Sequence, residues 1–245
     1  MTQWQVQLLG DVRDLEYLAN VMDSGLRKVL REKTDGYLYE SNSFTTCDAS
    51  SEVEQLAEEE LAVLSGILKI ERGAREALNY GAVYRQNAAG GRDIFVRVNE
   101  NLHIRAEVSA MIAVVKDVQG NVLSQPVPPL PRSVILLQLA STNKSIAKVL
   151  RLLSATDAMT WVGLYRIHDV IEEDVGGQHK LETQGWCSAD DLRRFKHSAN
   201  SVHVGGDTAR HGTERQVPPK NPMTLSEAEA YGKYLVQSWL VSKGA

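Results

Sequence analysis

Cysteine is scarce in this chain of 245 residues, and long hydrophobic runs are missing. The two cysteines, Cys47 and Cys187, lie far apart and provide neither a disulfide framework nor a four-cysteine metal site. No stretch approaches the roughly 18 apolar residues that a membrane span requires. The opening MTQWQVQLLGDVRD reaches a charge too early for a signal peptide. These absences predict a cytoplasmic protein with reduced thiols and no membrane partner.

An excess of basic charge is also missing. The formal net charge is -4 and the isoelectric point is near 5.9. This balance argues against a generally basic surface for duplex nucleic acid, but a local basic cleft for phosphate remains compatible with it. The hydrophobic share of 43% and the charged share of 24% are typical of a folded chain.

Proline is restricted to two places. Four of the seven prolines lie in PVPPLP at 126–131, which resists both helix and internal strand pairing. We therefore expect a stiff linker at 124–132 between an N-terminal domain, 1–123, and a C-terminal domain, 133–245. The alternative use of this segment is as a proline-rich ligand for an aromatic groove.

The N-terminal domain alternates between strand and helix patterns. Strands are predicted at 4–10 and 37–44, the second after a turn at Thr34–Gly36. Asp11 opens one helix, and Ser50 or Ser51 caps another, whose Glu58-Glu59-Glu60 run we interpret as its solvated side.

The hydrophobic period changes to two after Gly81. AVYRQ at 82–86, RDIFVRV at 92–98 and HIRAEVSAMIAVV at 103–115 predict a three-stranded antiparallel meander. The N-terminal domain is therefore expected to be α+β, with a mixed sheet that contains this meander.

The C-terminal domain is predicted to be all-helical. Helical patterns cover 135–139, 146–153 and 157–174, and an exposed loop is expected to follow to Trp186. His168 falls on the apolar stripe of the third pattern, which favours a hydrogen-bonded core residue over a ligand. Thr224-x-x-Glu227 gives a capping box for a final helix that presents Leu225, Ala228, Tyr231, Leu235 and Trp239.

The segment 188–212 gathers most of the residues that could perform chemistry. Ser188 begins a predicted helix with Leu192, Phe195, Ala199 and Val202 on its buried side. Gly205-Gly206 is expected to break this helix. Asp207 would then cap a short helical piece that folds Arg210 and His211 back toward His197 or His203.

Imidazoles with a pKa near neutrality supply acid and base, and guanidinium groups stabilise or orient phosphate. This chemistry predicts two sets of site residues: catalytic His211, Arg210, His203 and His197, and substrate-binding Arg193, Arg194 and Asn200. The histidines are six and eight positions apart, unlike a zinc pair on one helix face, so we predict no metal and no cofactor. A zinc site and a purely structural role remain the alternatives.

The order Ala209-Arg210-His211-Gly212, a polar loop, and Thr224-Leu-Ser-Glu-Ala228 opening an amphipathic helix resembles the end of HEPN-type helical domains. The likeness covers roughly 188–240. Ribonuclease members of that family carry an arginine and a histidine a few residues apart. In this chain Arg210 and His211 are adjacent, and eight residues separate Arg194 from His203. The resemblance implies a domain that cuts or binds RNA, or a binding or dimerisation module where the motif is missing.

The sequence thus predicts a cytoplasmic accessory or defence-like protein whose helical domain binds RNA or a nucleotide. The most specific version of this hypothesis is that the domain cleaves RNA without a metal ion. The alternative is a non-catalytic interaction or dimerisation protein in which the histidine and arginine segment is structural. A homo-oligomer or a protein partner is expected. The two hypotheses differ in whether His197, His203 and His211 converge.

Overall fold

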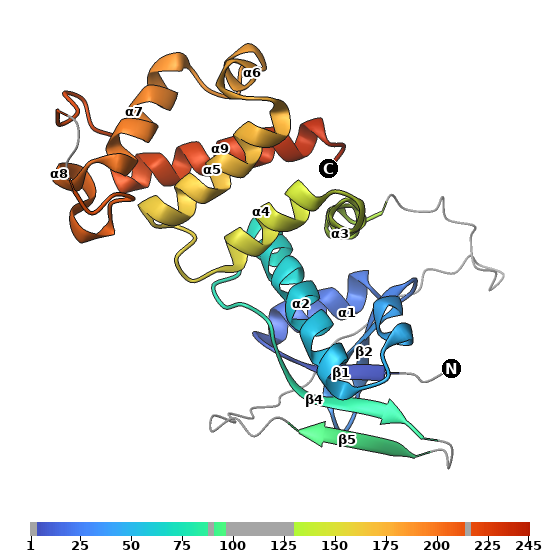
Figure 1. Cartoon of the computed structure of the whole chain (residues 1–245). Coiled ribbons are helices and arrows are strands. Elements are labelled where there is room, and N and C mark those ends of the chain that lie inside the picture. The colour runs from blue at the N-terminus through green and yellow to red at the C-terminus, as the bar shows by residue number, and fades with distance from the viewer. Residues whose placement is uncertain (1–3, 88–90, 97–129, 214–216) are drawn as a thin grey trace, which may run out of the picture.

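The computed structural model describes residues 4–87, 91–96, 130–213 and 217–245. A five-stranded antiparallel sheet lies in the N-terminal part and helices form the C-terminal part (Figure 1), which confirms the predicted α+β and all-helical organisation. The strand order is β2-β3-β1-β4-β5, so β1 lies at the centre. Every pairing among these described strands is antiparallel.

The elements follow one another along the chain as two groups. The N-terminal part contains β1 (Trp4–Leu9), α1 (Val12–Val21), β2 (Arg27–Glu32), β3 (Gly36–Ser41), the 3-10 helix η1 (Asn42–Thr46), α2 (Ser50–Arg72), β4 (Asn79–Gln86) and β5 (Arg92–Val96). The C-terminal part contains α3 (Arg132–Thr142), α4 (Lys144–Ser154), α5 (Trp161–Val175), α6 (Gln178–Thr183), α7 (Ala189–Asn200), α8 (Val202–Gly205), the 3-10 helix η2 (Gly206–Thr208) and α9 (Leu225–Ser242).

Local signals in the sequence explain most of the N-terminal boundaries. Asp11 caps α1 by accepting a hydrogen bond from the backbone N–H of Arg13 at 2.8 Å, as predicted. The predicted cap of α2 was wrong by one residue, because Ala49 occupies the cap position. There the Glu52 carboxylate accepts from the backbone N–H groups of Asp48 and Ala49 at 2.9 and 3.5 Å. Glu52 thus supplies the half of a capping box that reaches back from the third helical residue, and no side chain at position 49 supplies the other half.

The strand β2 was not predicted. Its sequence, RKVLRE, places Val29 and Leu30 side by side and so does not alternate cleanly. The strand forms because it pairs with β3 across the predicted turn at Thr34–Gly36, from Arg27 opposite Ser41 to Glu32 opposite Gly36. Strands β4 and β5 are the first two strands of the predicted meander, and the third, 103–115, lies outside the described residues.

One face of the sheet carries the main core. Alternate residues of the strands pack with α1 and α2 on this face, namely Trp4, Val6, Leu8, Val29, Tyr39 and Val83. On the opposite face Leu38, Ala82 and Tyr84 form a small separate buried cluster with Leu30 beside it. The sheet therefore buries apolar side chains on both faces in its middle strands.

Helix α2 connects the sheet to the helical part. It packs against β4 and η1 and also against α3 and α4. At Gly66 the helices approach so closely that an added Cβ would lie 2.1 Å from the carbonyl oxygen of Leu150 in α4. Only a glycine permits this backbone contact. As a result one hydrophobic core runs from Val6 in β1 to Trp239 in α9.

The predicted linker 124–132 lies mostly outside the described residues, and the boundary remains a prediction. Its last residue, Arg132, begins α3 and binds both parts of the fold. One guanidinium nitrogen donates to Glu71 at the end of α2 and another to Gln237 in α9, each at 2.8 Å.

The acidic run of α2 is not uniformly solvated, and the interpretation of Glu60 was wrong. Its side chain is 13% exposed and accepts hydrogen bonds from four side chains: Arg27, Tyr39, Ser41 and Ser43. Glu58 and Glu59 are exposed as expected. Glu60 lies one helical turn after Leu56 and faces the sheet, so the same helix side that packs on η1 also buries this carboxylate.

The predicted helix at 157–174 begins later than expected, at Trp161. The Thr160 side chain caps it by accepting from the backbone N–H of Gly163 at 3.2 Å. The loop expected before Trp186 contains α6, which is anchored by the fully buried Leu181. Gly176, with φ of 89°, ends α5 one residue after the predicted end of the helical pattern at 174.

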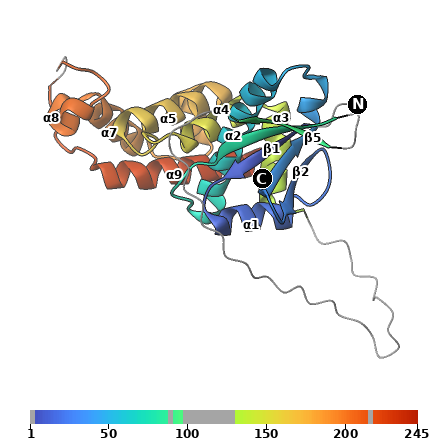
Figure 2. The ribbon, with the colours of Figure 1, turned by 90° about the horizontal axis from the view of Figure 1, so that it is seen from below.

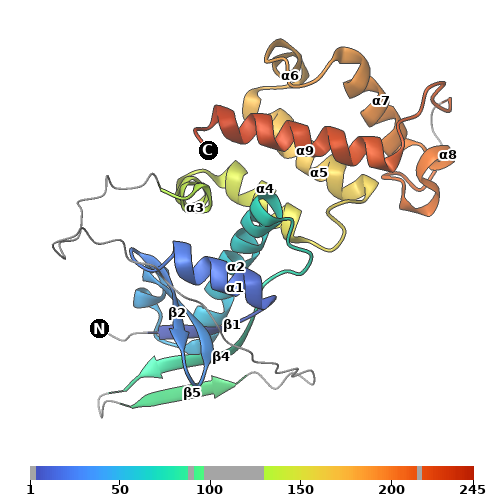
Figure 3. The same ribbon diagram turned by 180° about the vertical axis from the view of Figure 1, so that it is seen from behind.

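The helical part forms a layer beyond α2 and α4. Helices α5 and α9 run side by side, with α7 packed along them and α6 beside the end of α5 (Figure 3). Seen from below, the sheet and the α7–α8 region lie at opposite ends of the molecule (Figure 2). Within the described ranges, no helix has both the length and the apolar character that crossing a bilayer requires.

Candidate functional site

The predicted substrate-binding arginines make contacts within the fold. Arg193 is exposed and pairs with Asp190 one turn earlier in α7. Arg194 is 19% exposed and reaches the segment that precedes α9. Its guanidinium donates to the carbonyls of Asn221 and Pro222 at 3.3 and 3.4 Å, and to the Glu227 carboxylate at 3.1 Å. Arg194 therefore fastens this segment to α7.

His197 has a similar role. Its Nε2 lies 2.8 Å from the carbonyl oxygen of Val217, which fixes Nε2 as the donor. One residue later, the buried hydroxyl of Ser198 accepts the backbone N–H of Met223 at 2.8 Å. Both contacts join the middle of α7 to the polar segment 217–223.

Arg210 does fold back onto α7, as expected, but its partners are not imidazoles. Its backbone N–H donates to the carbonyl of Ala199 at 2.9 Å, and Nη1 donates to Oδ1 of Asn200 at 3.4 Å. The guanidinium lies 4.1 Å from the ring centre of Tyr165, and Nη2 lies 4.0 Å from Asp169. This geometry combines a cation–π contact with an ion pair.

The segment after α7 differs from the predicted helices. Ser201 has extended backbone angles and ends α7, so Val202 and His203 belong to the separate short helix α8. Arg210 and His211 lie in a bend rather than in a helix capped by Asp207, which itself falls inside η2. His203 and His211 are both exposed. In the described part of the chain, no three histidine, cysteine or acidic side chains are grouped so that they could hold a metal ion.

His168 is a core residue, as predicted, and is 1% exposed. Its ring lies 5.3 Å from that of Phe195 and 6.1 Å from that of Tyr231. Its Nδ1 is 3.4 Å from the Glu172 carboxylate, which Lys196 approaches to 2.6 Å. No described residue gives either ring nitrogen a hydrogen bond of ordinary geometry, so the expectation that this core histidine is hydrogen-bonded was wrong. Burial, together with the charge of Lys196, lowers the pKa of His168 to about 3, so the ring is neutral.

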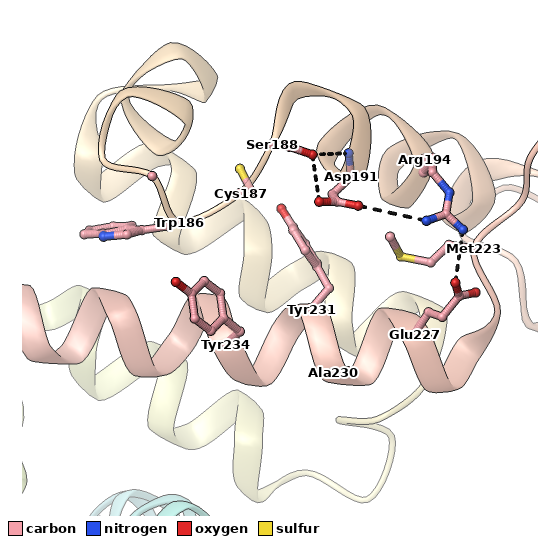
Figure 4. A pocket seen from close by; sticks show the side chains of 11 residues that line it. Trp186, Cys187, Ser188, Asp191, Arg194, Met223, Glu227, Ala230, Tyr231 and Tyr234 are labelled. Atoms are coloured by element: carbon pink, nitrogen blue, oxygen red, sulfur yellow. Dashed lines mark hydrogen bonds and ion pairs between the residues drawn. The ribbon is translucent and has the colours of Figure 1, made fainter.

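A groove that the sequence did not predict lies between α9, the start of α7 and the chain at 185–188 (Figure 4). It has a volume of about 490 Å³. Trp186 and Tyr234 lie toward one end of it, and Asp191, Arg194 and Glu227 toward the other. Its remaining lining residues are Gly185, Cys187, Ser188, Met223, Ala230 and Tyr231.

The charged end of the groove is held in a fixed arrangement. Ser188 donates to Asp191 at 2.7 Å, and Arg194 lies 3.9 Å from Asp191 and 3.1 Å from Glu227. Glu227 also closes the capping box of α9 by accepting the backbone N–H of Thr224 at 2.7 Å. This backbone hydrogen bond, with the Thr224 side chain and Arg194, lowers the pKa of Glu227 to about 2. The Glu227 carboxylate is therefore ionised at neutral pH.

The middle of the groove contains a phenol and a thiol. The Tyr231 hydroxyl points from α9 toward Cys187 (Figure 4), and burial raises the pKa of both groups. The thiol is thus protonated at neutral pH and is a poor nucleophile. Among the described residues, none makes a hydrogen bond of ordinary geometry to the buried Tyr231 oxygen. This oxygen is closed off from solvent, and the polar group with which it interacts is the Cys187 thiol.

Sequence reasoning missed the groove for two reasons. The exposed loop was expected to run to Trp186, although Trp186 is half-buried against the main core, as is Cys187 after it. Tyr231 was assigned to the buried stripe of the last helix, while Leu225 on the same predicted stripe is 38% exposed. The useful signal was a tryptophan and a cysteine directly before the Ser188 cap, where a solvated loop seldom places them.

No family model, curated protein or solved structure matches the chain. The resemblance to HEPN-type domains, based on Arg210, His211 and the start of α9, stays a prediction.

Proposed function

We propose that this protein is a non-catalytic interaction protein whose helical part binds a protein partner. The observation that carries the proposal is the position of Arg194. Its Nε and Nη2 donate to two backbone carbonyls and to Glu227, so three of its five N–H donors are already used, and Nη1 lies 3.9 Å from Asp191. A guanidinium that grips phosphate needs its planar fork free for the ligand.

The contacts of His197 and Arg210 support the same conclusion. The Nε2 proton of His197 is committed to Val217, and the guanidinium of Arg210 lies over Tyr165 beside Asp169 and Asn200. Of the predicted catalytic groups, His203 and His211 are exposed, and they lie on different segments from His197. This arrangement favours the structural role that the sequence left open over metal-independent RNA cleavage.

The experiment compares RNA cleavage with stability. We expect the wild-type chain neither to cut nor to bind a mixed RNA pool or nucleotides in the absence of metal. Arg194→Ala should lower the free energy of unfolding by about 0.5–1.5 kcal/mol, the usual net contribution of a hydrogen bond, because its partners Asn221, Pro222 and Glu227 are exposed. The neighbouring exposed Arg193→Ala is the matched control and should change it by less than about 0.5 kcal/mol.

Ribonuclease activity would give a different pattern. RNA cleavage by the wild type that His211→Ala abolishes, while the unfolding transition stays in place, would overturn the proposal and restore the enzyme hypothesis. RNA binding that Arg210→Lys weakens without a loss of stability would contradict it as well, because lysine keeps the charge and loses the fork.

A further inference from the structure

We infer that the exposed face of α4 binds an acidic segment of a partner protein. The inference rests on the proposed function and names the chemistry of the partner. Three features of α4 carry it: a row of cations without carboxylate partners, the unfavourable position of these cations on the helix, and the burial of the opposite side of the helix.

The exposed face of α4 carries a row of three cations. Lys144, Lys148 and Arg151 are exposed, and they lie four and three positions apart, so they project from one side of the helix. At about 1.5 Å per helical residue, the row is about 10 Å long. These three residues form the cationic face of α4.

No carboxylate of the fold neutralises the cationic face. The sequence contains no aspartate or glutamate between Asp117 and Asp157. Asp157 itself lies 3.3 Å from Arg166. Asp174, on the neighbouring helix α5, already pairs with Lys243 at 2.7 Å. Within the part of the chain that the structure describes, no carboxylate forms an ion pair with the cationic face.

The arrangement of these cations is unfavourable for α4 itself. Like charges that are three or four residues apart repel each other on a helix surface, and Lys148 has such a neighbour on each side. Lys144 is the first residue of α4, where the positive end of the helix dipole disfavours a cation, and the first turn contains no acidic residue. Only Arg151, in the last turn, suits the dipole. Carboxylates bound along this face would offset the repulsion.

The apolar side of α4 is not available to a ligand. Ile146, Val149, Leu150 and Leu153 belong to the main core, and α4 packs between α2 and α5 (Figure 1). A basic amphipathic helix binds a membrane surface by inserting its apolar side. Because that side is buried here, the cationic face interacts through charge, which favours an anionic partner in water.

Two observations favour an acidic protein segment over a nucleic acid. Helices α3 and α4 contain no aromatic residue, so they provide no ring on which a base could stack beside the cations. The formal net charge of -4 already includes the three cations, so the remainder of the chain is more negative still. A long polyanion such as RNA would extend from this short row over a negative surface, whereas a short acidic segment can stay on the row.

The test uses the full chain at low ionic strength, with binding followed by amide chemical shifts during titration. The probe is acetyl-Glu-Ala-Ala-Glu-Glu-Ala-Ala-Glu-amide, and the control peptide has glutamine in place of every glutamate. We expect the acidic peptide to bind at least about tenfold more tightly than the glutamine peptide, a difference of about 1.4 kcal/mol. Added salt should weaken this binding, because the attraction is between exposed charges. Equal affinities of the two peptides would overturn the inference.

Charge reversal locates the binding site. Lys148→Glu should weaken binding of the acidic peptide by at least about tenfold, because Lys148 lies in the middle of the row. Lys33→Glu is the matched control, since it makes the same change in net charge at an exposed position between β2 and β3. An equal loss from the two substitutions would show attraction by overall charge rather than by the cationic face, and would contradict the inference.

Thermal unfolding gives an independent readout. Lys144→Glu should raise the unfolding temperature by about 1–4 °C, because glutamate suits the positive end of the helix and attracts Lys148. The same substitution should weaken binding of the acidic peptide. A lower unfolding temperature would show that Lys144 has a carboxylate partner within the fold, which is incompatible with the inference.

A short oligouridylate tests the nucleic-acid alternative. If it binds as tightly as the acidic peptide and Lys148→Glu weakens both, α4 is a phosphate-binding surface and the inference is wrong. Absence of binding by the acidic peptide would also overturn the inference, and would leave an interaction protein with a different docking surface. RNA cleavage, in contrast, would overturn the proposed function whatever the peptides do.

Discussion

At the scale of single residues, Glu60 shows that an acidic run on a helix can contain one structural carboxylate. It ties α2 to β2, β3 and η1 through hydrogen bonds from Arg27, Tyr39 and Ser43. Hydrogen bonds to a carboxylate stabilise a fold more than hydrogen bonds between neutral groups. The side chains that donate to Glu60 are half-buried or buried. Helical periodicity separates the three residues of this run, because Glu60 lies one turn after Leu56 and one turn before Leu64, on the apolar side of α2, and Glu58 and Glu59 do not. The burial of Glu60 could therefore have been predicted from the apolar stripe, although its partners on β2, β3 and η1 could not.

We predict that Glu60→Gln lowers the free energy of unfolding by about 2–3 kcal/mol, because the neutral amide cannot accept from four donors. Denaturant unfolding would measure this. The adjacent Glu59→Gln is the control and should change the value by less than about 0.5 kcal/mol. Equal effects of the two substitutions would show that Glu60 is solvated in solution.

His168 links stability to pH. The folded state holds its pKa at about 3, whereas the ordinary value is 6.5. Between these values the unfolded chain binds a proton that the folded chain does not, so stability falls as the pH is lowered through this window. The charged groups that face the ring are Glu172 on its own helix and Lys196 on α7, and the neighbouring phenol is Tyr231 on α9.

We predict that the wild type loses up to about 2 kcal/mol of unfolding free energy between pH 7 and pH 5 through His168, at about 1.4 kcal/mol per pH unit. His168→Leu should remove this part of the slope, even if it changes stability at pH 7. His179→Leu, an exposed position on α6, should leave the slope unchanged. An identical slope in wild type and His168→Leu would contradict the prediction.

At the scale of elements, the contact of α2 with α4 depends on one residue without a side chain. Gly66 lies in the middle of a 23-residue helix, where glycine is otherwise unfavourable. Glycine is required at this position because three backbone atoms of Leu150 in α4 would lie 2.8 Å or less from an added Cβ. Because three backbone atoms are involved, rotation of a side chain cannot relieve the clash.

We predict that Gly66→Ala lowers the free energy of unfolding by more than about 2 kcal/mol, since the helices must move apart. Gly232→Ala in α9 is the control, because its Cβ would meet only the end of the Leu164 side chain at 3.0 Å. That substitution should change stability by no more than about 1 kcal/mol. If Gly66→Ala is as well tolerated as Gly232→Ala, the close approach of α2 and α4 is not maintained in solution.

Helices and strands could be predicted from the sequence where residues near their ends determine them. They could not be predicted where pairing or packing with a distant segment stabilises them. The Asp11, Ser188 and Thr224 caps and the end of the helix near 174 were predicted correctly, because the residues that begin and end a helix lie within a few positions of its boundary. Strand β2 and helix α6 were missed because pairing with β3 and burial of Leu181 stabilise them. For the same reason the sequence located the segment 188–212 but not the groove, which needs α9 and Trp186 in place.

At the scale of the whole molecule, the two parts of the chain are not separate bodies joined only by a linker. The core on α2 continues through α4 to α5 and α9, and Arg132 binds both α2 and α9. The predicted proline-rich boundary can still mark where the chain tolerates a cut, because the contacts that join the parts do not depend on chain continuity there.

We predict that residues 1–123 and 133–245, produced together, form a complex that unfolds in one transition. Each fragment alone should be less stable, because the first uncovers the surface of α2 around Gly66 and the second uncovers the surface of α4 around Leu150. Co-purification and thermal unfolding would measure this. Should each fragment alone unfold at the temperature of the intact chain, the parts are independent domains and their contact contributes little.

The contact at Gly66 also has a consequence for synthesis of the chain. Its partner, Leu150, is translated after a further ~80 residues, which at about 5–20 residues per second takes about 4–16 s. During this interval the face of α2 that packs against α4 in the folded protein stays exposed to solvent. A nascent chain at this stage is a natural substrate for chaperones, and slowing translation between the two positions should increase aggregation more than slowing it after α4 has emerged.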